Sequence, residues 1–361
     1  MLKQPTQDLR YVADGENAAG LNAAWTDLRK RSADAAPASG PELVLPFLGK
    51  ANLASVYAQG QLLLTVPLRK GRLFDQSFHS QITDCGLCHA DRLNGPAAVA
   101  LLLSKRGKPI LLKAIPAQSH LLVMFENAGT HVAVLKTWQR AALNVKGGFE
   151  DWLNANFETK RRKEFKRLRN RLGEQGVLKA TSSPTGDAGA FIGEFMKLEA
   201  TGWKGSRGTA LARQPAIASA ARQALSALHR AGKLRFWSLE LDGKTIASLF
   251  AYVDGNKAAL GKITYDEAFS KYSPGVLLIL DATEDIFAEG TISEVDSSAM
   301  PDHPMIDRIW RNRIAMADVM VAPASVSALR FKLIVTAVKM RRTVRAALKS
   351  AYHWVRRKSR S

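Results

Sequence analysis

Residues 233–267, "KLRFWSLELDGKTIASLFAYVDGNKAALGKITYDE", restrict the possible folds of this chain more than any other stretch. The Asp-Gly pairs at 242–243 and 254–255 are hairpin-turn signals, and they separate three apolar segments. This pattern predicts three antiparallel strands that follow one another directly. Segment 270–290 then has the pattern of a turn and a helix, and 292–299 reads as one more short strand.

The length of the chain and its local patterns predict more than one domain. A chain of 361 residues is too long for one ordinary core. We expect a hairpin that turns at Gln59-Gly60, a helix over 94–107 and a strand over 108–116. The expected organisation is a loosely ordered lead-in over 1–40, an N-terminal domain over 41–150, a second domain over 151–325, and a basic helical tail over 326–361.

The net charge of +20 is concentrated in two segments. Residues 158–171 carry a net +6 and residues 330–361 a net +11, which leaves +3 on the remaining 315 residues. This segregation predicts docking surfaces for anionic partners rather than a fold that is basic throughout. The amphipathic helical pattern of 330–361 leaves three interpretations open: a helix packed on the body with a solvated basic face, a helix on an anionic membrane surface, or a nucleic-acid contact.

The segment "DCGLCHADRL", residues 84–93, contains the spacing Cys85-x-x-Cys88-His89 of a c-type haem attachment site. Haem attachment needs export, and the polar N-terminus has no leader-like apolar stretch. A zinc site would need a second ligand pair, and the chain has only these two cysteines. We therefore expect no haem and no metal, and a cytoplasmic protein, with peripheral binding to the inner face of the membrane through 330–361 as an open question.

Three blocks of the second half resemble a known family. "LEATGWKGSRGTAL", "GKITYDEAFSKYSPGVLL" and "DSSAMPDHP...IWRNR" are similar to the acetyltransferase domain of CelD-type cellulose- and exopolysaccharide-biosynthesis proteins, which belong to the GNAT superfamily. The superfamily also includes the Fem-type transferases, which pair two GNAT-like domains. The resemblance covers roughly residues 155–320. It implies an α/β fold of two GNAT-like domains, each a mixed, mainly antiparallel sheet flanked by helices, with a degenerate first domain.

The resemblance implies a site in a V-shaped split between strands 257–266 and 292–299. An acyl-CoA arm would enter the split, with its pyrophosphate at the start of the helix after it. The implied cofactor-binding residues are Tyr272, Ser273, Pro274, Gly275 and Val276. The family's phosphate loop usually has two small residues, whereas "KYSPGV" has one glycine, which weakens the case for coenzyme A.

Catalytic roles follow from the same resemblance. Asp266 or Asp296 is the expected general base, and Tyr265 or Tyr272 would protonate the leaving thiolate. The resemblance also places Lys262 in the cleft as a catalytic candidate, and a lysine in an apolar strand predicts an anionic partner. The resemblance places two further cleft residues, Trp203 and Lys204, at the substrate. The alternatives are a Trp203 that only covers the core and an Asp266 that only caps a turn; a lone loop histidine, His303, is expected to be exposed.

We therefore expect an N- or O-acyltransferase that moves an acyl group from acetyl-CoA or another acyl-CoA to a small-molecule or saccharide acceptor in cell-envelope biosynthesis. One alternative is a transferase that takes its acyl group from aminoacyl-tRNA, with 158–171 on RNA phosphates. Another is a non-catalytic scaffold at a membrane. Substrate assignment from fold analogy is weak, so these three remain open.

Overall fold

The computed structural model describes residues 8–13, 20–32, 35–48, 52–83, 88–89, 94–183, 186–202, 205 and 208–358, and for 52, 88–89, 349–350 and 352–358 the backbone only. The first half contains β1 (Leu9–Ala13), α1 (Leu21–Arg31), α2 (Pro41–Leu48), β2 (Asn52–Ala58), β3 (Gln61–Arg69), β4 (Asp75–Ser77), β5 (Cys88–His89), α3 (Gly95–Arg106), β6 (Ile110–Pro116), α4 (His120–Asn127) and β7 (His131–Asn144). The second half contains α5 (Phe149–Asn156), α6 (Thr159–Gly173), β8 (Leu178–Ser183), α7 (Ala188–Thr201), α9 (Pro215–Arg230), β9 (Leu234–Leu241), β10 (Lys244–Asp254), β11 (Lys257–Tyr265), η3 (Glu267–Tyr272), α10 (Pro274–Glu289), β12 (Glu294–Asp296), β13 (Asn312–Ala322) and α11 (Ala328–Lys358).

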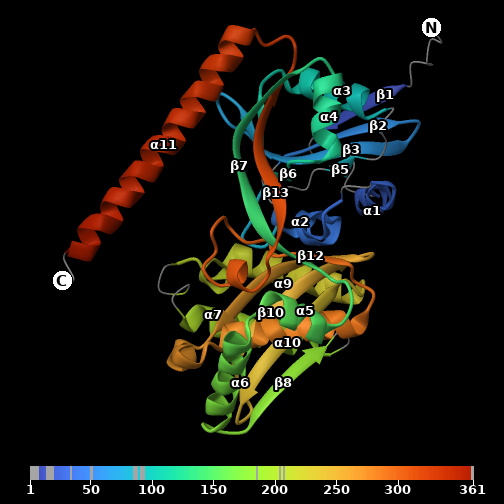
Figure 1. Ribbon diagram of the computed structural model, residues 1–361. Helices are drawn as coiled ribbons and strands as arrows, with labels where there is room; N and C mark the ends of the chain where they lie inside the picture. The colour runs from blue at the N-terminus through green and yellow to red at the C-terminus, as the bar shows by residue number, and fades with distance from the viewer. Residues whose placement is uncertain are drawn as a thin grey trace.

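One mixed sheet runs through the molecule (Figure 1), in the order β1-β2-β3-β4-β6-β13-β7-β12-β11-β10-β9-β8. From each edge of the sheet inward, neighbouring strands are antiparallel until a parallel pair is reached. This pair is β4 with β6 in the first half and β11 with β12 in the second. A helix, α3 or α10, joins the two strands of each parallel pair. The two halves are therefore similar in topology, and the expected fold class is confirmed: two mixed, mainly antiparallel α/β units flanked by helices.

The centre of the sheet consists of exchanged strands. β7 closes the first half in sequence but pairs with β12, while β13 pairs with β6 of the first half. The two exchanged strands pair with each other antiparallel, from Asn312↔Ala142 to Ala322↔His131. The proposed boundaries at 150 and 325 thus divide the chain in sequence, whereas β13 lies in space among strands of the first half.

Short turns with positive φ explain the hairpins. Gln59 and Gly60 have φ of 50° and 80°, and Asp242 and Gly243 have φ of 49° and 76°, as the inverse type I turn requires at both positions. Both expected turns are confirmed. The turn after β10 differs by one residue from the expectation, because Asp254 still pairs with Lys257 and the loop begins at Gly255.

The sheet of the second half is covered on both faces. Alternate residues of β10 point to opposite sides: Leu249 packs under α10 and α5, and Phe250 packs under α7 and α9. This double burial explains why β10 reads as one apolar run. Helix α10 begins at Pro274 and ends before Gly290, which has a left-handed φ of 66°. Its start is therefore set by local sequence and lies beside the end of β11.

The expectation of a loosely ordered lead-in over 1–40 is wrong for the described part of that segment. β1 pairs with β2, and Trp25 and Leu28 of α1 are fully buried. Leu21, Trp25 and Leu28 recur at helical spacing and pack with Leu62 and Phe78. The Ala- and Asp-rich composition hid this apolar stripe.

Helix α11 extends along one side of the molecule and projects from it (Figure 1). Phe331 and Ile334 pack on Leu111 and Met320 of the sheet. No helix in the described part of the chain is long and apolar enough to cross a bilayer.

Candidate active site

The parallel strands β11 and β12 separate after a short contact. They pair only from Lys257↔Glu294 to Ala259↔Asp296. Beyond this point β11 has a bulge opposite Phe250 and Ala251, at Gly261. A Cβ atom on Gly261 would collide with the Phe250 ring, so the bulge requires glycine. The chain after β12 turns away through Ser298, whose φ is 51°. A V-shaped opening results between the two strands.

A small cavity of about 270 Å³ lies along the open part of β11. It is lined by Glu199, Gly202, Ile263, Thr264, Tyr265, His303, Pro304 and Met305. The start of α10 adjoins it, because a Cβ on Gly275 would lie 3.2 Å from Tyr265 Cδ1 and 3.6 Å from Met305 Sδ. The helix N-terminus, with its partial positive charge, is therefore next to this cavity.

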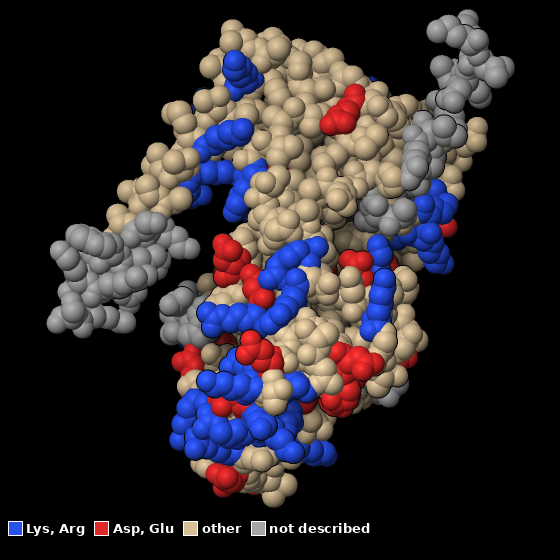
Figure 2. All heavy atoms as spheres, in the orientation of Figure 1, with Lys and Arg blue, Asp and Glu red and all other residues tan. Residues whose placement is uncertain are grey.

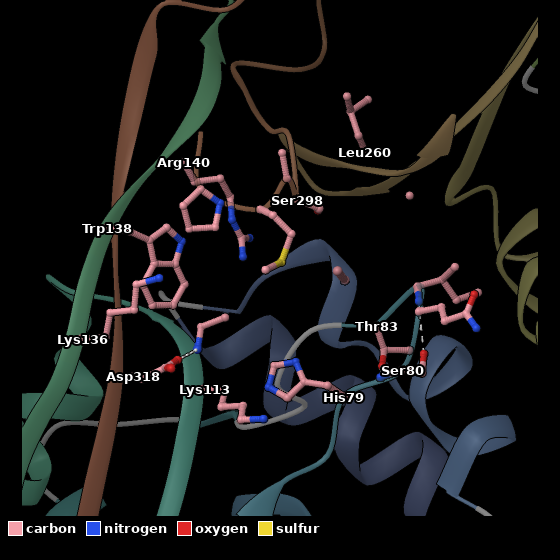
Figure 3. A pocket seen from close by; sticks show the side chains of 18 of the residues that line it. His79, Ser80, Thr83, Lys113, Lys136, Trp138, Arg140, Leu260, Ser298 and Asp318 are labelled. Carbon is pink, nitrogen blue, oxygen red and sulfur yellow. Dashed lines mark hydrogen bonds between the residues drawn. The ribbon is translucent and has the colours of Figure 1, made fainter. Parts of the chain in front are cut away.

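A larger cavity of about 700 Å³ lies between the two halves (Figure 3). Leu260 and Gly261 of β11 line it on one side, together with the 298–301 loop that follows β12. Residues 79–83 and Lys113 of the first half line the other side, and β7 and β13 form its floor with Lys136, Trp138, Arg140 and Asp318. The split in the second half therefore opens into a space that both halves enclose.

Lys262 forms a buried ion pair between the two cavities. Its Nζ lies 2.6 Å from Glu199 Oε1 and donates a hydrogen bond of 3.0 Å to Gln81 Oε1. The Glu199 side chain is fully buried, and its Oε2 accepts a 2.8 Å hydrogen bond from the Leu211 N–H. Burial lowers the pKa of Lys262, and the charge of Glu199 opposes that shift. The anionic partner that the strand lysine predicts is present, in α7.

The two aspartates expected as general bases accept hydrogen bonds from other groups of the protein. Asp266 accepts a hydrogen bond from the Ala268 N–H at the start of η3 and one of 3.0 Å from Lys244. Burial acts to raise the pKa of Asp266, but Lys244 and the Ala268 N–H hold it below its ordinary value. Asp296 accepts from Arg140 Nη1 at 2.9 Å and from the Ser298 N–H at 2.8 Å. Neither aspartate lines either of these two cavities, but Arg140 and Ser298, which donate to Asp296, line the larger one.

The remaining expected residues fall into three groups. Tyr265 lines the small cavity, and Ser273, Pro274, Gly275 and Val276 form the first turn of α10 beside it. Tyr272 is buried in the core, with Lys271 Nζ 4.8 Å from its ring centre. Trp203, Lys204 and Cys85 lie outside the described residues, as do the side chains of Cys88 and His89.

Three residues of the site were missed in the sequence. Glu199 continues the apolar stripe of α7 through Phe195, a signal that could have predicted its burial. Gln81 had no local signal. His303 is half-buried rather than exposed; it lines the small cavity, and its Nδ1 accepts from the Met305 N–H at 3.3 Å. In the described residues, no group of three or more His, Cys, Asp or Glu side chains is arranged to hold a metal ion.

Comparison with known proteins agrees with this geometry. Residues 159–302 match the model of the acetyltransferase (GNAT) domain family, and no curated protein matches the chain. The C-terminal domain of a putative lysylphosphatidylglycerol synthetase from Agrobacterium fabrum is similar in structure (TM-score 0.57, 14% identity, 88% of this chain and 95% of that one). FemX is also similar in structure (TM-score 0.55, 13% identity, 87% of this chain and 98% of that one). So is L-PGS from Bacillus licheniformis (TM-score 0.55, 10% identity, 88% of this chain and 95% of that one).

At these identities the solved structures show a shared fold. The family match covers the split, Lys262 and the start of α10. Residues 159–302 thus form a GNAT acetyltransferase domain, and the protein is an acyltransferase.

Proposed function

We propose that the protein transfers an acyl group from acyl-CoA to an amine or hydroxyl of an acceptor held between its two halves. One observation carries the proposal: the β11/β12 split has a helix N-terminus at one end and the interdomain cavity at the other, with Lys262 between them. A donor and an acceptor that entered from these two ends would meet beside the Gly261 bulge.

The donor end is suited to an extended thioester with a phosphate tail. The small cavity follows β11 from Ile263 to Tyr265, and the positive end of α10, with the Gly275 N–H, lies beside it for a pyrophosphate. Gly275 allows close approach to the backbone there. Bound acyl-CoA would supply the activated acyl carbon, and the residues of the chain would position it.

The residues around the bulge provide the remaining chemistry. As the acceptor attacks the thioester carbon, the Lys262 ammonium, fixed by Glu199 and Gln81, would donate to the developing oxyanion. The acceptor's proton would pass to a base, for which Asp296 is the better candidate because its partners line the acceptor cavity. Asp266, with its lowered pKa, is a weaker base. When the C–S bond breaks, Tyr265 would protonate the departing thiolate.

The identity of the acceptor is a finer part of the proposal. The CelD-type resemblance favours a saccharide of the cell envelope. A cavity of about 700 Å³ is large enough for a small molecule or a sugar unit.

The exposed face of α11 supports a role at an anionic membrane surface. Leu329, Leu333, Met340, Val344 and Leu348 are all more than half exposed. At 100° per residue they fall within an arc of about 100°. Arg330 and Arg341 flank this stripe on one side and Lys339 on the other. An apolar stripe between basic borders is typical of helices that lie in a membrane interface.

A second candidate is transfer from aminoacyl-tRNA, as in Fem-type relatives. The observation that favours it is the basic surface of α6, which Figure 2 shows as a continuous group of cationic side chains. Its exposed members are Lys160, Arg161, Lys163, Lys166, Arg167 and Arg171.

Thermal unfolding with acetyl-CoA and longer acyl-CoAs tests the donor. A ligand at 100 times its Kd stabilises the folded state by about 2.7 kcal/mol, a shift of several degrees in Tm. We expect this shift in the native protein and its loss in Gly275→Asp, with Gly148→Asp as a control remote from the cleft. No shift with any acyl-CoA, together with salt-sensitive tRNA binding, would favour the second candidate.

A further inference from the structure

The cavity between the halves is lined by four cationic side chains. Lys113 comes from β6, Lys136 and Arg140 from β7, and Arg342 from α11. Figure 3 shows Lys136, Trp138 and Arg140 on β7, with Lys113 and Asp318 on the strands beside them. Asp318 is the one carboxylate among the described lining residues.

Two of the four cations are neutralised by the protein. Arg140 Nη1 lies 2.9 Å from Asp296, and Arg342 Nη2 lies 2.9 Å from Asp318. For Lys113 and Lys136, no carboxylate of the described residues lies within 4.0 Å of Nζ. The cavity therefore has an excess of positive charge with no counter-charge in the part of the chain that the structure describes.

Backbone hydrogen bonds and a bulge of β6 fix the position of Lys113. Its backbone N–H donates to Ser77 Oγ at 3.0 Å, and the next residue, Ala114, has a left-handed φ of 50° and donates its N–H to Asp318 Oδ1 at 3.0 Å. This bulge interrupts the register between β6 and β13. Burial lowers the pKa of Lys113; Asp318 opposes the shift, and Arg342 increases it. An unpaired ammonium held in this way is costly unless an anion reaches it.

Hydrogen-bond donors without acceptors lie around the same cavity. Trp138 Nε1 and Arg342 Nη1 are both inaccessible to solvent, and within the described chain neither has an acceptor. Both groups can only donate. The Ser298 hydroxyl, in the loop after β12, is also without a partner there. These groups come from β7, α11 and the loop after β12, so chain folding has brought unsatisfied donors together around one space.

We propose that this cavity binds a phosphate-bearing acceptor, with the phosphate between Lys113 and Lys136 and, once the Trp138 and Arg342 side chains turn toward it, with its oxygens accepting from these two donors. A phosphate offers the negative charge and several acceptor oxygens that this set of groups lacks. The assignment rests on the proposed acyl transfer, because Leu260 and Gly261 at the edge of the split line the same cavity. The acceptor's hydroxyl or amine would point toward that edge.

Calorimetric titration of the full-length protein tests the site. The probes are inorganic pyrophosphate, glucose 1-phosphate and short-chain phosphatidic acid, with glucose as the neutral control. We expect phosphate probes to bind, more weakly at higher salt. Lys113→Met should weaken binding by about tenfold or more and Trp138→Phe by a few-fold, while Lys113→Arg retains binding. The matched control, Lys179→Met on the exposed edge strand β8, should leave Kd unchanged.

Glucose 1-phosphate binding more tightly than phosphatidic acid would indicate a soluble sugar phosphate, and the reverse a lipid headgroup; both support an anion site. The anion site would be overturned if no phosphate probe binds, or if the Lys113→Met and Lys136→Met variants bind these probes as tightly as the native protein does. Displacement of acetyl-CoA by glucose 1-phosphate would overturn the acceptor assignment, since the anion site would then belong to the donor. Phosphate binding that depends on Lys113, in a protein that does not bind acetyl-CoA, would instead reject the acyl-CoA proposal alone.

Discussion

Lys262 of β11 and Glu199 of α7 form a buried ion pair, with Nζ 2.6 Å from Oε1 and the lysine side chain only 11% exposed. The pair ties the bulged strand of the split to the helix that covers it. Because Gln81 of the first half also accepts from Lys262, the same ammonium connects the two halves. It is therefore a structural group of the split as well as the cation that we propose for the oxyanion.

Breaking this pair on one side should destabilise the protein strongly. Glu199→Gln leaves the Lys262 charge buried without its counter-charge, and we expect a loss of about 3 kcal/mol in the free energy of unfolding. Urea unfolding measures this. The double variant with Lys262→Met should lose less than the sum of the two single losses. Glu164→Gln, in the exposed pair with Arg167, is the control and should change little; additive losses would show that Lys262 and Glu199 are not coupled.

The rate should fall at high pH because of Lys262. Burial puts its folded pKa below the ordinary 10.5, so the ammonium that would stabilise the oxyanion is lost as the pH rises through that lowered pKa. Slow hydrolysis of acetyl-CoA, followed by thiol release, gives the profile without a known acceptor. Lys262→Met should be about 10²-fold slower and lack this alkaline limb. A wild-type profile that stays flat up to pH 10.5 would rule out the ammonium as the oxyanion donor.

Glycine at the bulge should be required for stability as well as for the split. In Gly261→Ala, the new methyl group meets the Phe250 ring, and we expect a loss of about 1–3 kcal/mol and of acetyl-CoA binding. Gly193→Ala in α7 is the matched control, because nothing lies within 4 Å of its Cβ position. That change should stabilise by about 0.5–1 kcal/mol. Equal effects of the two changes would contradict a steric role for Gly261.

The pair of Glu289 with Arg235 should contribute to stability in a pH-dependent way. Its hydrogen bonds to Arg235 lower the pKa of Glu289 below 4.5, so its contribution is present above that pH and is lost as the pH falls through the lowered value. Glu289→Gln should make the decline of stability below pH 5 shallower. The effect at neutral pH should be no more than about 1 kcal/mol, because the pair is partly exposed. Chemical unfolding at pH 7 and pH 3 measures the difference.

The apolar stripe of α11 should govern binding to anionic vesicles. Leu333→Glu or Val344→Glu should weaken co-sedimentation with phosphatidylglycerol vesicles by about tenfold, since a charge replaces an apolar group that would enter the membrane interface. Val177→Glu is the control, an apolar residue outside the helix that is also more than half exposed. A loss of similar size in that variant would show that net charge, not the stripe, controls binding.

Much of the second half could be predicted from local sequence. The Asp242-Gly243 turn, the start of α10 at Pro274 and the burial of β10 all depend on residues that are neighbours in the chain, so turn chemistry and periodicity are sufficient. The position of Lys262 within an apolar strand likewise predicted an anionic partner for it. In the first half, the apolar spacing of Trp25 and Leu28 was present but was obscured by composition.

The tertiary structure alone decided which groups meet. The exchange of β7 and β13 pairs residues 170 to 191 positions apart, and no local pattern encodes that choice, because strand pairing is set by the burial of the whole sheet. It also decided that Asp296 pairs with Arg140, and that Lys113 and Trp138 line one cavity. Local sequence determines the elements, whereas the functional site consists of side chains that only long-range packing brings together.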